Sequence, residues 1–408
     1  MTATFQPDSP EQVVEAVTWA LSSGTPLSVA GRGSKAAFGR PVAAAQGLSL
    51  AGLTGITLYE PEELVMQAGP GTGLAEIEAA LAEKGQELAF EPADLGPLLG
   101  GPAAAGSIGG AVACNLAGPR RVKAGAARDH LLGFAAVSGR GELFHSGGRV
   151  VKNVTGYDLC KLLAGSFGTL GVMTTLTFKV LPRAEKTRTL LAYGLEAEAA
   201  TALLCAAAGS PHEVSGLAHL PAAVAARSAV GRVADAGRPV TAIRIEGPGA
   251  SVEYRLRALA ALAGATAAET EELHSHNSRT LWREIRDVGL FGALGDRVVW
   301  RLSVAPTAGP ATAAAVLAQL PGEAFLDWSG GLVWLALDGG DDAGAAVVRA
   351  ALPGSGGHAT LVRAPEAVRG RVPVFQPLAP ALAALSARVK ASFDPEGLLN
   401  PGRMYEGI

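Results

Sequence analysis

Three glycine-rich clusters constrain the fold of this chain more than any other feature of its sequence. They read GRGSK at residues 31–35, GSIGG at 106–110 and GSFGTLGV at 165–172. Glycines allow successive backbone N–H groups to converge on an anion, although they lose more conformational entropy on folding than other residues. Three such clusters in one part of the chain favour a domain built around a phosphate-bearing ligand. None has the spacing of a Walker loop or of GxGxxG.

Two of the clusters, taken singly, have a simpler explanation. GRGSK has the composition of a surface turn, and two glycines after a helix cap at Ser107 are compatible with a tight helix–sheet contact. Each glycine costs about 1 kcal/mol relative to alanine in a helix interior. A ligand that approaches the backbone at the start of that helix would account for the cost.

The first 182 residues predict a mixture of helices and antiparallel strands. Residues 9–12, SPEQ, have the form of a capping box with proline at the first helical position, so a helix is expected to run to Ser23 and to end at Gly24. A short apolar strand at 26–30 leads directly into GRGSK. Further strands are expected at 56–59, 64–68, 131–138, 142–145 and 172–180, and a helix after residue 73.

Pro182 and the charged residues after it mark a domain boundary, beyond which strands and helices alternate. A β-α-β-β-α order begins at residue 189 and a similar order begins at residue 298, which predicts two related βαββαβ units that share an antiparallel sheet. A helix at 278–288 would join them, and a helix at 380–393 would return to the first domain. The predicted fold class is α+β, with domains at 1–182, 183–365 and 366–408.

The composition of the chain excludes several classes of function. The chain has 408 residues, which allows two or three domains, and its net charge of −3 gives no basic surface for nucleic acid. Cys114, Cys160 and Cys205 are odd in number and far apart, which fits a reducing cytoplasm and no metal site. The N-terminus lacks the basic and apolar regions of an export signal. The uncharged stretch 95–119 is too rich in glycine and proline for a membrane span.

Five motifs in order carry a resemblance to a known family: GRGSK, GSIGG, GPRR with GAARD, KNVTGYDLCKLLAGSFGTLGV and FDPEGLLNPGRMY. They resemble the FAD-linked oxidases with the vanillyl-alcohol-oxidase, or PCMH-type, fold. LWREIRDVGLF and WRLSVAPTAG extend the likeness to the FAD-binding E subunits of bacterial glycolate oxidases, over nearly the whole chain. The resemblance implies a two-part PCMH-type FAD-binding domain, an antiparallel-sheet ferredoxin-like cap domain, and a C-terminal helix and tail that return to the FAD domain.

The resemblance also implies which residues contact a noncovalently bound FAD. The pyrophosphate would be held by Arg32, Gly33, Ser34 and Lys35, with Ser107, Gly109 and Gly110 along it. Arg128 and Asp129 would flank the cofactor loop, Gly168, Thr169, Gly171 and Val172 would meet the adenine end, and Asn400 would return from the tail toward the flavin. No histidine or cysteine lies in or near GRGSK to attach a flavin covalently.

Catalytic residues are not identifiable from this sequence. Oxidation of a 2-hydroxy acid needs a hydride acceptor, a base and a cation for the carboxylate, and FAD supplies only the first. Arg283, Arg286 and Arg301 are candidates for the carboxylate, each of them also explicable as a surface or ion-paired arginine. The chain lacks the histidine-rich GHxGDGNxH segment with which related self-sufficient dehydrogenases hold a metal and the substrate. His274 and His276 are expected in a polar loop.

Three hypotheses follow. In the first, the chain is an FAD-containing subunit that works with a catalytic flavoprotein subunit and an iron–sulfur subunit, in a cytoplasmic complex that oxidises glycolate or another small 2-hydroxy acid and meets the inner membrane only through its complex. In the second, it is a stand-alone alcohol or 2-hydroxy-acid oxidase. In the third, it is a non-catalytic interaction subunit with structural FAD. Turnover by the purified chain with an artificial electron acceptor separates the first two.

Overall fold

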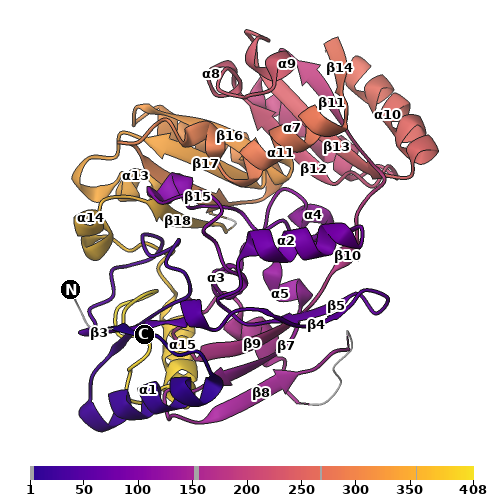
Figure 1. The fold of residues 1–408 in the computed structure, drawn as a ribbon. Helices are drawn as coiled ribbons and strands as arrows, with labels where there is room; N and C mark the ends of the chain where they lie inside the picture. The colour runs from indigo at the N-terminus through magenta and orange to yellow at the C-terminus, as the bar shows by residue number, and fades with distance from the viewer. Residues whose placement is uncertain (1–3, 151–155, 267–268, 355) are drawn as a thin grey trace. The chain divides into compact units, whose positions relative to one another are not determined.

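The computed structural model describes residues 4–150, 156–266, 269–354 and 356–408, and it divides into two compact units (Figure 1). Unit 1 comprises Met1–Ala117, Gly125–Arg183 and Pro377–Ile408, and unit 2 comprises Gly118–Ala124 and Ala184–Gln376. The long segment of unit 2 begins after Arg183, one residue beyond the domain boundary expected at Pro182. The placement of residues 118–124 in unit 2 has no counterpart in the sequence analysis.

Unit 1 is built on two main sheets. A parallel sheet has the order β1-β3-β2, and an antiparallel sheet has the order β4-β5-β9-β7-β8. The strands are β1 (Thr4–Phe5), β2 (Leu27–Ala30), β3 (Gln46–Ser49), β4 (Ile56–Glu60), β5 (Val65–Ala68), β7 (Leu131–Val137), β8 (Leu143–Gly147) and β9 (Val172–Lys179), with a separate pair of β6 (Gln86–Glu87) and β10 (Leu181–Pro182). Two sheets of different type confirm the expected two-part domain.

The helices of unit 1 begin and end largely where their capping residues predict. The Ser9 side chain accepts a hydrogen bond from the Gln12 N–H, and Gly24 ends the first helix with a φ of 61°. The helices are α1 (Pro10–Ser23), α2 (Leu74–Glu83), α3 (Ile108–Ala113), α5 (Ala127–His130), α6 (Leu159–Leu163) and α15 (Pro380–Phe393), with short 3-10 turns η1 (Leu50–Gly52) and η2 (Pro97–Leu99). Residues 151–155, within the motif that begins KNVTGY, lie outside the described residues.

The C-terminal tail completes the parallel sheet of unit 1. Leu27 N–H donates to the Leu398 carbonyl at 2.7 Å, and Asn400 N–H donates to the Leu27 carbonyl at 3.0 Å. Leu398 and Leu399 are buried in one core cluster with Val13 and Val17 of α1. The tail is therefore an integral part of the unit that contains GRGSK.

Unit 2 contains one eight-stranded antiparallel sheet with the order β14-β11-β13-β12-β16-β17-β15-β18. Each half of the sheet is one βαββαβ unit, and numbering the strands from one to four within each unit gives the order 4-1-3-2 for the first and its reverse, 2-3-1-4, for the second. The strands are β11 (Lys186–Tyr193), β12 (Gly216–Leu220), β13 (Val240–Gly247), β14 (Glu269–Leu273), β15 (Val298–Ser303), β16 (Gly322–Asp327), β17 (Leu332–Leu337) and β18 (His358–Arg363). The two predicted ferredoxin-like units that share a sheet are confirmed.

Helices cover both faces of the first half of this sheet. α7 (Ala197–Ala208) and α10 (Gly249–Gly264) share a buried core with Ile243 and Ile245 of β13, and α11 (Ser275–Arg286) places Trp282 against β11 on the other face. The remaining helices are α4 (Arg121–Ala124), α8 (Ala222–Ala225), α9 (Gly231–Ala234), α12 (Gly309–Leu317), α13 (Ala345–Ala350) and α14 (Glu366–Arg371), with 3-10 turns η3 (Gly289–Phe291), η4 (Pro306–Ala308), η5 (Trp328–Gly330) and η6 (Gly340–Asp342). No helix in the described part of the chain has the length and apolarity that crossing a bilayer requires.

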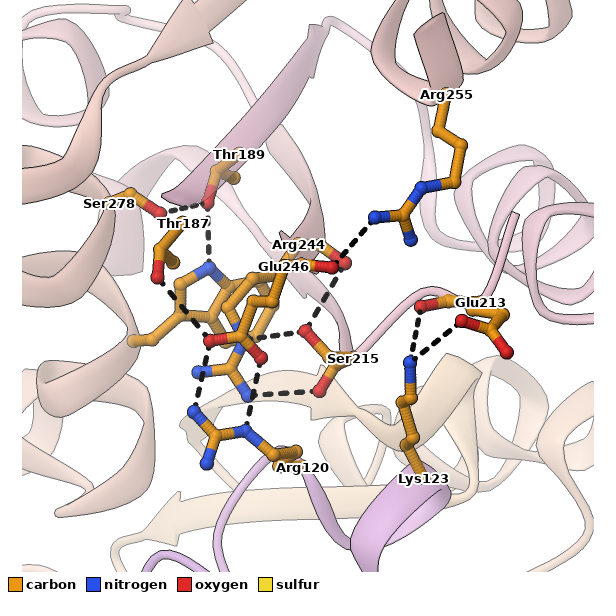
Figure 2. A network of polar contacts seen from close by, with 11 residues as sticks. Arg120, Lys123, Thr187, Thr189, Glu213, Ser215, Arg244, Glu246, Arg255 and Ser278 are labelled. Atoms are coloured by element: carbon orange, nitrogen blue, oxygen red, sulfur yellow. Dashed lines mark hydrogen bonds and ion pairs between the residues drawn. The ribbon is translucent and has the colours of Figure 1, made fainter. Parts of the chain in front are cut away.

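Residues 118–124 are fastened to unit 2 by a charged network, which Figure 2 shows from close by. Arg120 donates two hydrogen bonds to the Glu246 carboxylate, at 3.0 and 2.9 Å. Arg244 lies 3.7 Å from the same carboxylate and donates to the Ser215 carbonyl at 2.9 Å. Arg244 also lies over the ring of Trp282, 4.8 Å from its centroid. The Glu246 carboxylate on β13 thus binds residues 118–124, which are distant from β13 in the sequence.

Glu246→Gln is expected to lower the free energy of unfolding by about 2 kcal/mol at pH 7, because the change leaves two buried guanidinium groups without their anion. Burial raises the pKa of Glu246, but Arg244 and Arg120 outweigh it and hold the pKa at about 2. This value lies below the ordinary pKa of about 4.3 for an unfolded glutamate. The ionised group therefore stabilises the fold above about pH 4.3, and its contribution is lost as the pH falls toward 2.

Urea unfolding of the wild type, Glu246→Gln and the exposed control Glu253→Gln on α10 measures this effect. The deficit of Glu246→Gln relative to the wild type should shrink between pH 5 and pH 3, while Glu253→Gln stays close to the wild type at each pH. A deficit that is independent of pH would show that the ionised carboxylate is not the stabilising species.

Candidate functional site

A cleft in unit 1 opens where β2 ends and GRGSK begins. It contains about 500 Å³ of open space and is lined by GRGSK, by α3 and its cap, and by the C-terminal tail. Lys35 Nζ donates to Ser34 Oγ at 3.1 Å, which holds the lysine beside the loop. The expected pyrophosphate residues Arg32, Gly33, Ser34 and Lys35 therefore line one wall together, with two cationic side chains among them.

The opposite wall comes from the start of α3. Ser107 Oγ accepts the Gly110 N–H at 3.3 Å, as expected for the cap of this helix. A methyl group on Gly31 would lie 2.7 Å from Ser107 Oγ, and one on Gly110 would lie 3.0 Å from Lys35 Cε. Side chains at these two positions would intrude between the walls of the cleft, so Gly31 and Gly110 keep it open.

Glycine is required at position 109 for a different structural reason. A methyl group there would lie 2.6 Å from Pro70 Cβ and 2.7 Å from the Pro70 carbonyl oxygen. The Gly109 N–H donates to that carbonyl at 2.9 Å. The close backbone contact with the GPGTG loop accounts for Gly109 without a ligand, so the alternative of tight packing applies to this glycine, and the ligand explanation is stronger at Gly110.

Asn400 brings the tail into the same cleft. Its Oδ1 accepts the Val29 N–H at 2.7 Å, and its Nδ2 donates to the Val29 carbonyl at 3.1 Å and to the Phe167 carbonyl at 2.8 Å. The residue is 3% exposed and has a φ of 44°. Asn400 therefore joins β2, the GSFGTLGV loop and the tail at the cleft.

Arg403 is a cleft residue that the sequence analysis missed. Its guanidinium donates to the carbonyls of Arg40 and Lys35, both at 3.0 Å, and to that of Phe38. It lines the cleft with Lys35 and adds a third cation to it. The signal available in the sequence was its place in the NPGR run of the tail motif, three residues after Asn400.

A second cleft of about 390 Å³ adjoins the first and shares six of its lining residues. Gly109, Gly168 and Gly171 line it, together with apolar side chains that include Leu50 and Met173. Its walls are mostly apolar, in contrast to the cationic first cleft. The two clefts together form a continuous site with one charged and one apolar part.

Four of the expected cofactor residues do not line either cleft. The Asp129 carboxylate accepts the Ala126 N–H at 2.9 Å, and the Arg128 N–H donates to Asn115 Oδ1 at 3.0 Å, so both residues shape the turn into α5. Thr169 is 2% exposed and donates from its hydroxyl to the Ser166 carbonyl, while Val172 is fully buried in the core. Their contact with a cofactor stays a prediction.

The clefts fit a ligand with a phosphate group and an extended apolar part. Arg32, Lys35 and Arg403 supply positive charge at one end, and Gly31 and Gly110 leave the backbone accessible there. The adjoining apolar walls suit an aromatic ring system, and the combined dimensions lie within the range of small-molecule sites. The residues present are therefore compatible with a dinucleotide such as FAD.

The three candidate arginines of unit 2 have different environments. Arg283 is exposed on α11, whereas Arg286 donates two hydrogen bonds to the Asp287 carboxylate at 2.7 and 2.9 Å. Arg301 is partly buried on β15 and lies over the Trp328 ring. His274 is the residue directly before α11, without a side-chain capping hydrogen bond, and His276 lies in the first turn of the helix and not in the expected loop.

Comparisons with known proteins identify the cofactor. A sequence profile described as an FAD binding domain matches residues 1–147. The chain is 36% identical over 400 residues, or 98% of each chain, to the Escherichia coli (strain K12) protein named glycolate oxidase subunit GlcE. It is also 29% identical over 191 residues, 47% of this chain and 39% of its relative, to the Bacillus subtilis (strain 168) protein named glycolate oxidase subunit GlcD.

Solved structures agree on the fold. A p-cresol methylhydroxylase with substrate bound matches 98% of this chain and 88% of its own chain with a TM-score of 0.72, at 15% identity. A 4-ethylphenol oxidase from Gulosibacter chungangensis matches with the same TM-score and identity, over 99% of this chain and 89% of its own. These likenesses confirm the expected PCMH-type fold. With the long alignment to GlcE, they show that the chain belongs to the family of FAD-linked oxidases and that its cofactor is FAD.

Proposed function

We propose that the chain is the FAD-binding subunit of a complex that oxidises glycolate or another small 2-hydroxy acid. The observation that carries the proposal is the alignment to GlcE over 98% of both chains, since both units share it. The similarity to proteins named D-lactate dehydrogenase supports the substrate class. The proposed partners are a catalytic flavoprotein subunit and an iron–sulfur subunit.

Within this function, the cleft residues would hold the cofactor. Arg32, Lys35 and Arg403 would neutralise the pyrophosphate, and the Gly110 N–H would approach it, while Gly168 and Gly171 would lie along the apolar part. Bound FAD would supply the two-electron acceptor. Arg128 and Asp129 would flank the cofactor loop, and Thr169 and Val172 would lie toward the adenine end, as the resemblance implies.

Co-purification tests the proposed function directly. The tagged chain, isolated from its native source, is expected to carry a second flavoprotein and an iron–sulfur protein, and the assembly should reduce a dye on addition of glycolate. The three cysteines are unpaired, which fits the proposed cytoplasmic location. Isolation without any partner would favour a stand-alone oxidase.

The flavin is expected to be FAD, noncovalent and stoichiometric. Cys114 lines the cleft, but burial raises the pKa of its thiol in spite of Lys35 and Arg403, which keeps it protonated and a poor nucleophile. Acid precipitation of the yellow protein should therefore release the colour, and chromatography should identify it as FAD. Cys114→Ser should release the same amount. Colour that stays in the wild-type pellet and disappears with Cys114→Ser would reveal a covalent link.

A further inference from the structure

Arg301 differs from the other partly buried arginines of unit 2. Arg227, Arg255 and Arg363 each donate side-chain hydrogen bonds to backbone carbonyls. Among the residues that the structure describes, the Arg301 guanidinium has no hydrogen-bond acceptor, and its recorded contact is with the Trp328 ring, 5.1 Å from the centroid. Arg301 is only partly buried, so these open N–H donors are available to a small ligand.

A second arginine approaches the same ring. Arg121, from the 118–124 segment, lies 5.2 Å from the Trp328 ring centroid. Burial, and then the charge of Arg121, lower the pKa of Arg301 to about 10, while Asp327 acts in the opposite direction. Arg121 and Asp327 are therefore both within electrostatic reach of Arg301.

His358 adds no charge to this cluster at neutral pH. Burial lowers the pKa of His358, and the charges of Arg301 and Arg121 lower it further. The imidazole, on β18 in register with Ser303, is thus neutral near pH 7. The positive charge near the Trp328 ring is therefore carried by the arginines and not by His358.

The backbone holds Trp328 in an unfavourable conformation. The turn between β16 and β17 has a φ of 51° at Trp328 and 61° at Ser329, values that large side chains rarely adopt. The Asp327 carboxylate accepts the Trp328 N–H at 2.7 Å, and the indole N–H donates to the Gly118 carbonyl at 3.2 Å. Such strain tends to persist at binding sites, because the rest of the structure compensates for it. Here the strained turn holds the Trp328 ring next to both guanidinium groups.

We propose that Arg301 and Arg121, held over the Trp328 ring, bind the carboxylate group of a small organic acid. A planar carboxylate matches the paired N–H donors of a guanidinium, and it would fill the open donors of Arg301. The naming of a 2-hydroxy acid as the occupant rests on the proposed function. The site itself rests on the geometry of unit 2.

Calorimetric titration of the FAD-loaded full-length chain with oxalate, a carboxylate without an oxidisable hydroxyl, tests the proposal. The wild type should bind oxalate, and Arg301→Gln should weaken the binding about 10-fold to 100-fold, as expected for loss of charge-assisted hydrogen bonds. Arg283→Gln, at an exposed arginine of the same unit, is the matched control and should bind like the wild type. Glycolate is titrated in parallel.

Folding and specificity are controlled separately. Circular dichroism checks each variant, and if Arg301→Gln does not fold, Arg301→Lys retains the charge and should still weaken oxalate binding by losing the paired donors. Equal affinities in the wild type and the Arg301 variants, no binding by the wild type, or sulfate bound as tightly as oxalate would each overturn the proposal. Oxalate binding through Arg301 in a chain whose complex does not oxidise glycolate would instead refute the proposed function and leave the site standing.

Discussion

Gly110→Val is expected to weaken FAD binding on the order of a hundredfold or more while the protein stays folded. A Cβ at this position would lie 3.0 Å from Lys35 Cε and 3.3 Å from Lys35 Nζ, so the branched side chain would displace the lysine and occupy the cationic cleft. Loss of a charged contact of this kind costs about 1.5–3 kcal/mol, and the added bulk blocks the approach of the phosphates. Flavin absorbance per protein measures the loss.

Gly109→Val separates cofactor binding from packing. Its side chain would collide with the Pro70 backbone, which cannot move aside like a lysine, so this variant should lose thermal stability as well as flavin. Gly264→Val, at the end of α10 where no atom lies within 4 Å of the added Cβ, is the control and should keep its flavin. Full flavin content in Gly110→Val would show that the cofactor does not pass this residue.

Much of the fold could be predicted because its signals are local. The cap at Ser9 and the glycine at position 24 define α1, and the two series of strands and helices in unit 2 give its ferredoxin-like order. The parallel pairing of β3 with β1 and β2 depends on contacts between distant segments, which leave no periodic pattern in the sequence. β14, which completes the first βαββαβ unit, has the composition ETEEL and lacks the apolar alternation of a typical strand.

The candidate site was predictable where glycine signals a close backbone approach, as at Gly110 and Gly168. It was not predictable where a long side chain returns from elsewhere. Arg403 reaches the cleft because the tail pairs with β2, and residues 118–124 join unit 2 through contacts with distant residues, such as that of Arg120 with Glu246. The same limit applies to Arg301, which became distinguishable from Arg283 and Arg286 once the partners of each guanidinium were known.

The isolated chain is expected to turn over glycolate and D-lactate at least about a thousandfold more slowly than the assembled complex. Orientation of a substrate against its catalytic groups can contribute roughly 7–11 kcal/mol to a reaction. The chain has clefts that fit FAD, but its sequence lacks the GHxGDGNxH segment that would place a metal and a base beside a hydroxy acid.

Dye reduction by glycolate measures this difference, first with the purified FAD-loaded chain and then after addition of a flavoprotein subunit that carries the histidine-rich segment and of an iron–sulfur subunit. Activity should require the flavoprotein partner. The same assay is repeated with the wild-type chain replaced by Glu246→Gln or by Gly110→Val. Only Gly110→Val is expected to lose its flavin. A loss of activity confined to that variant would therefore assign an electron-transfer role to the bound FAD. Equal activity with both variants would show that the FAD of this chain is structural and transfers no electrons. Rapid glycolate oxidation by the chain alone would show that it is a complete oxidase.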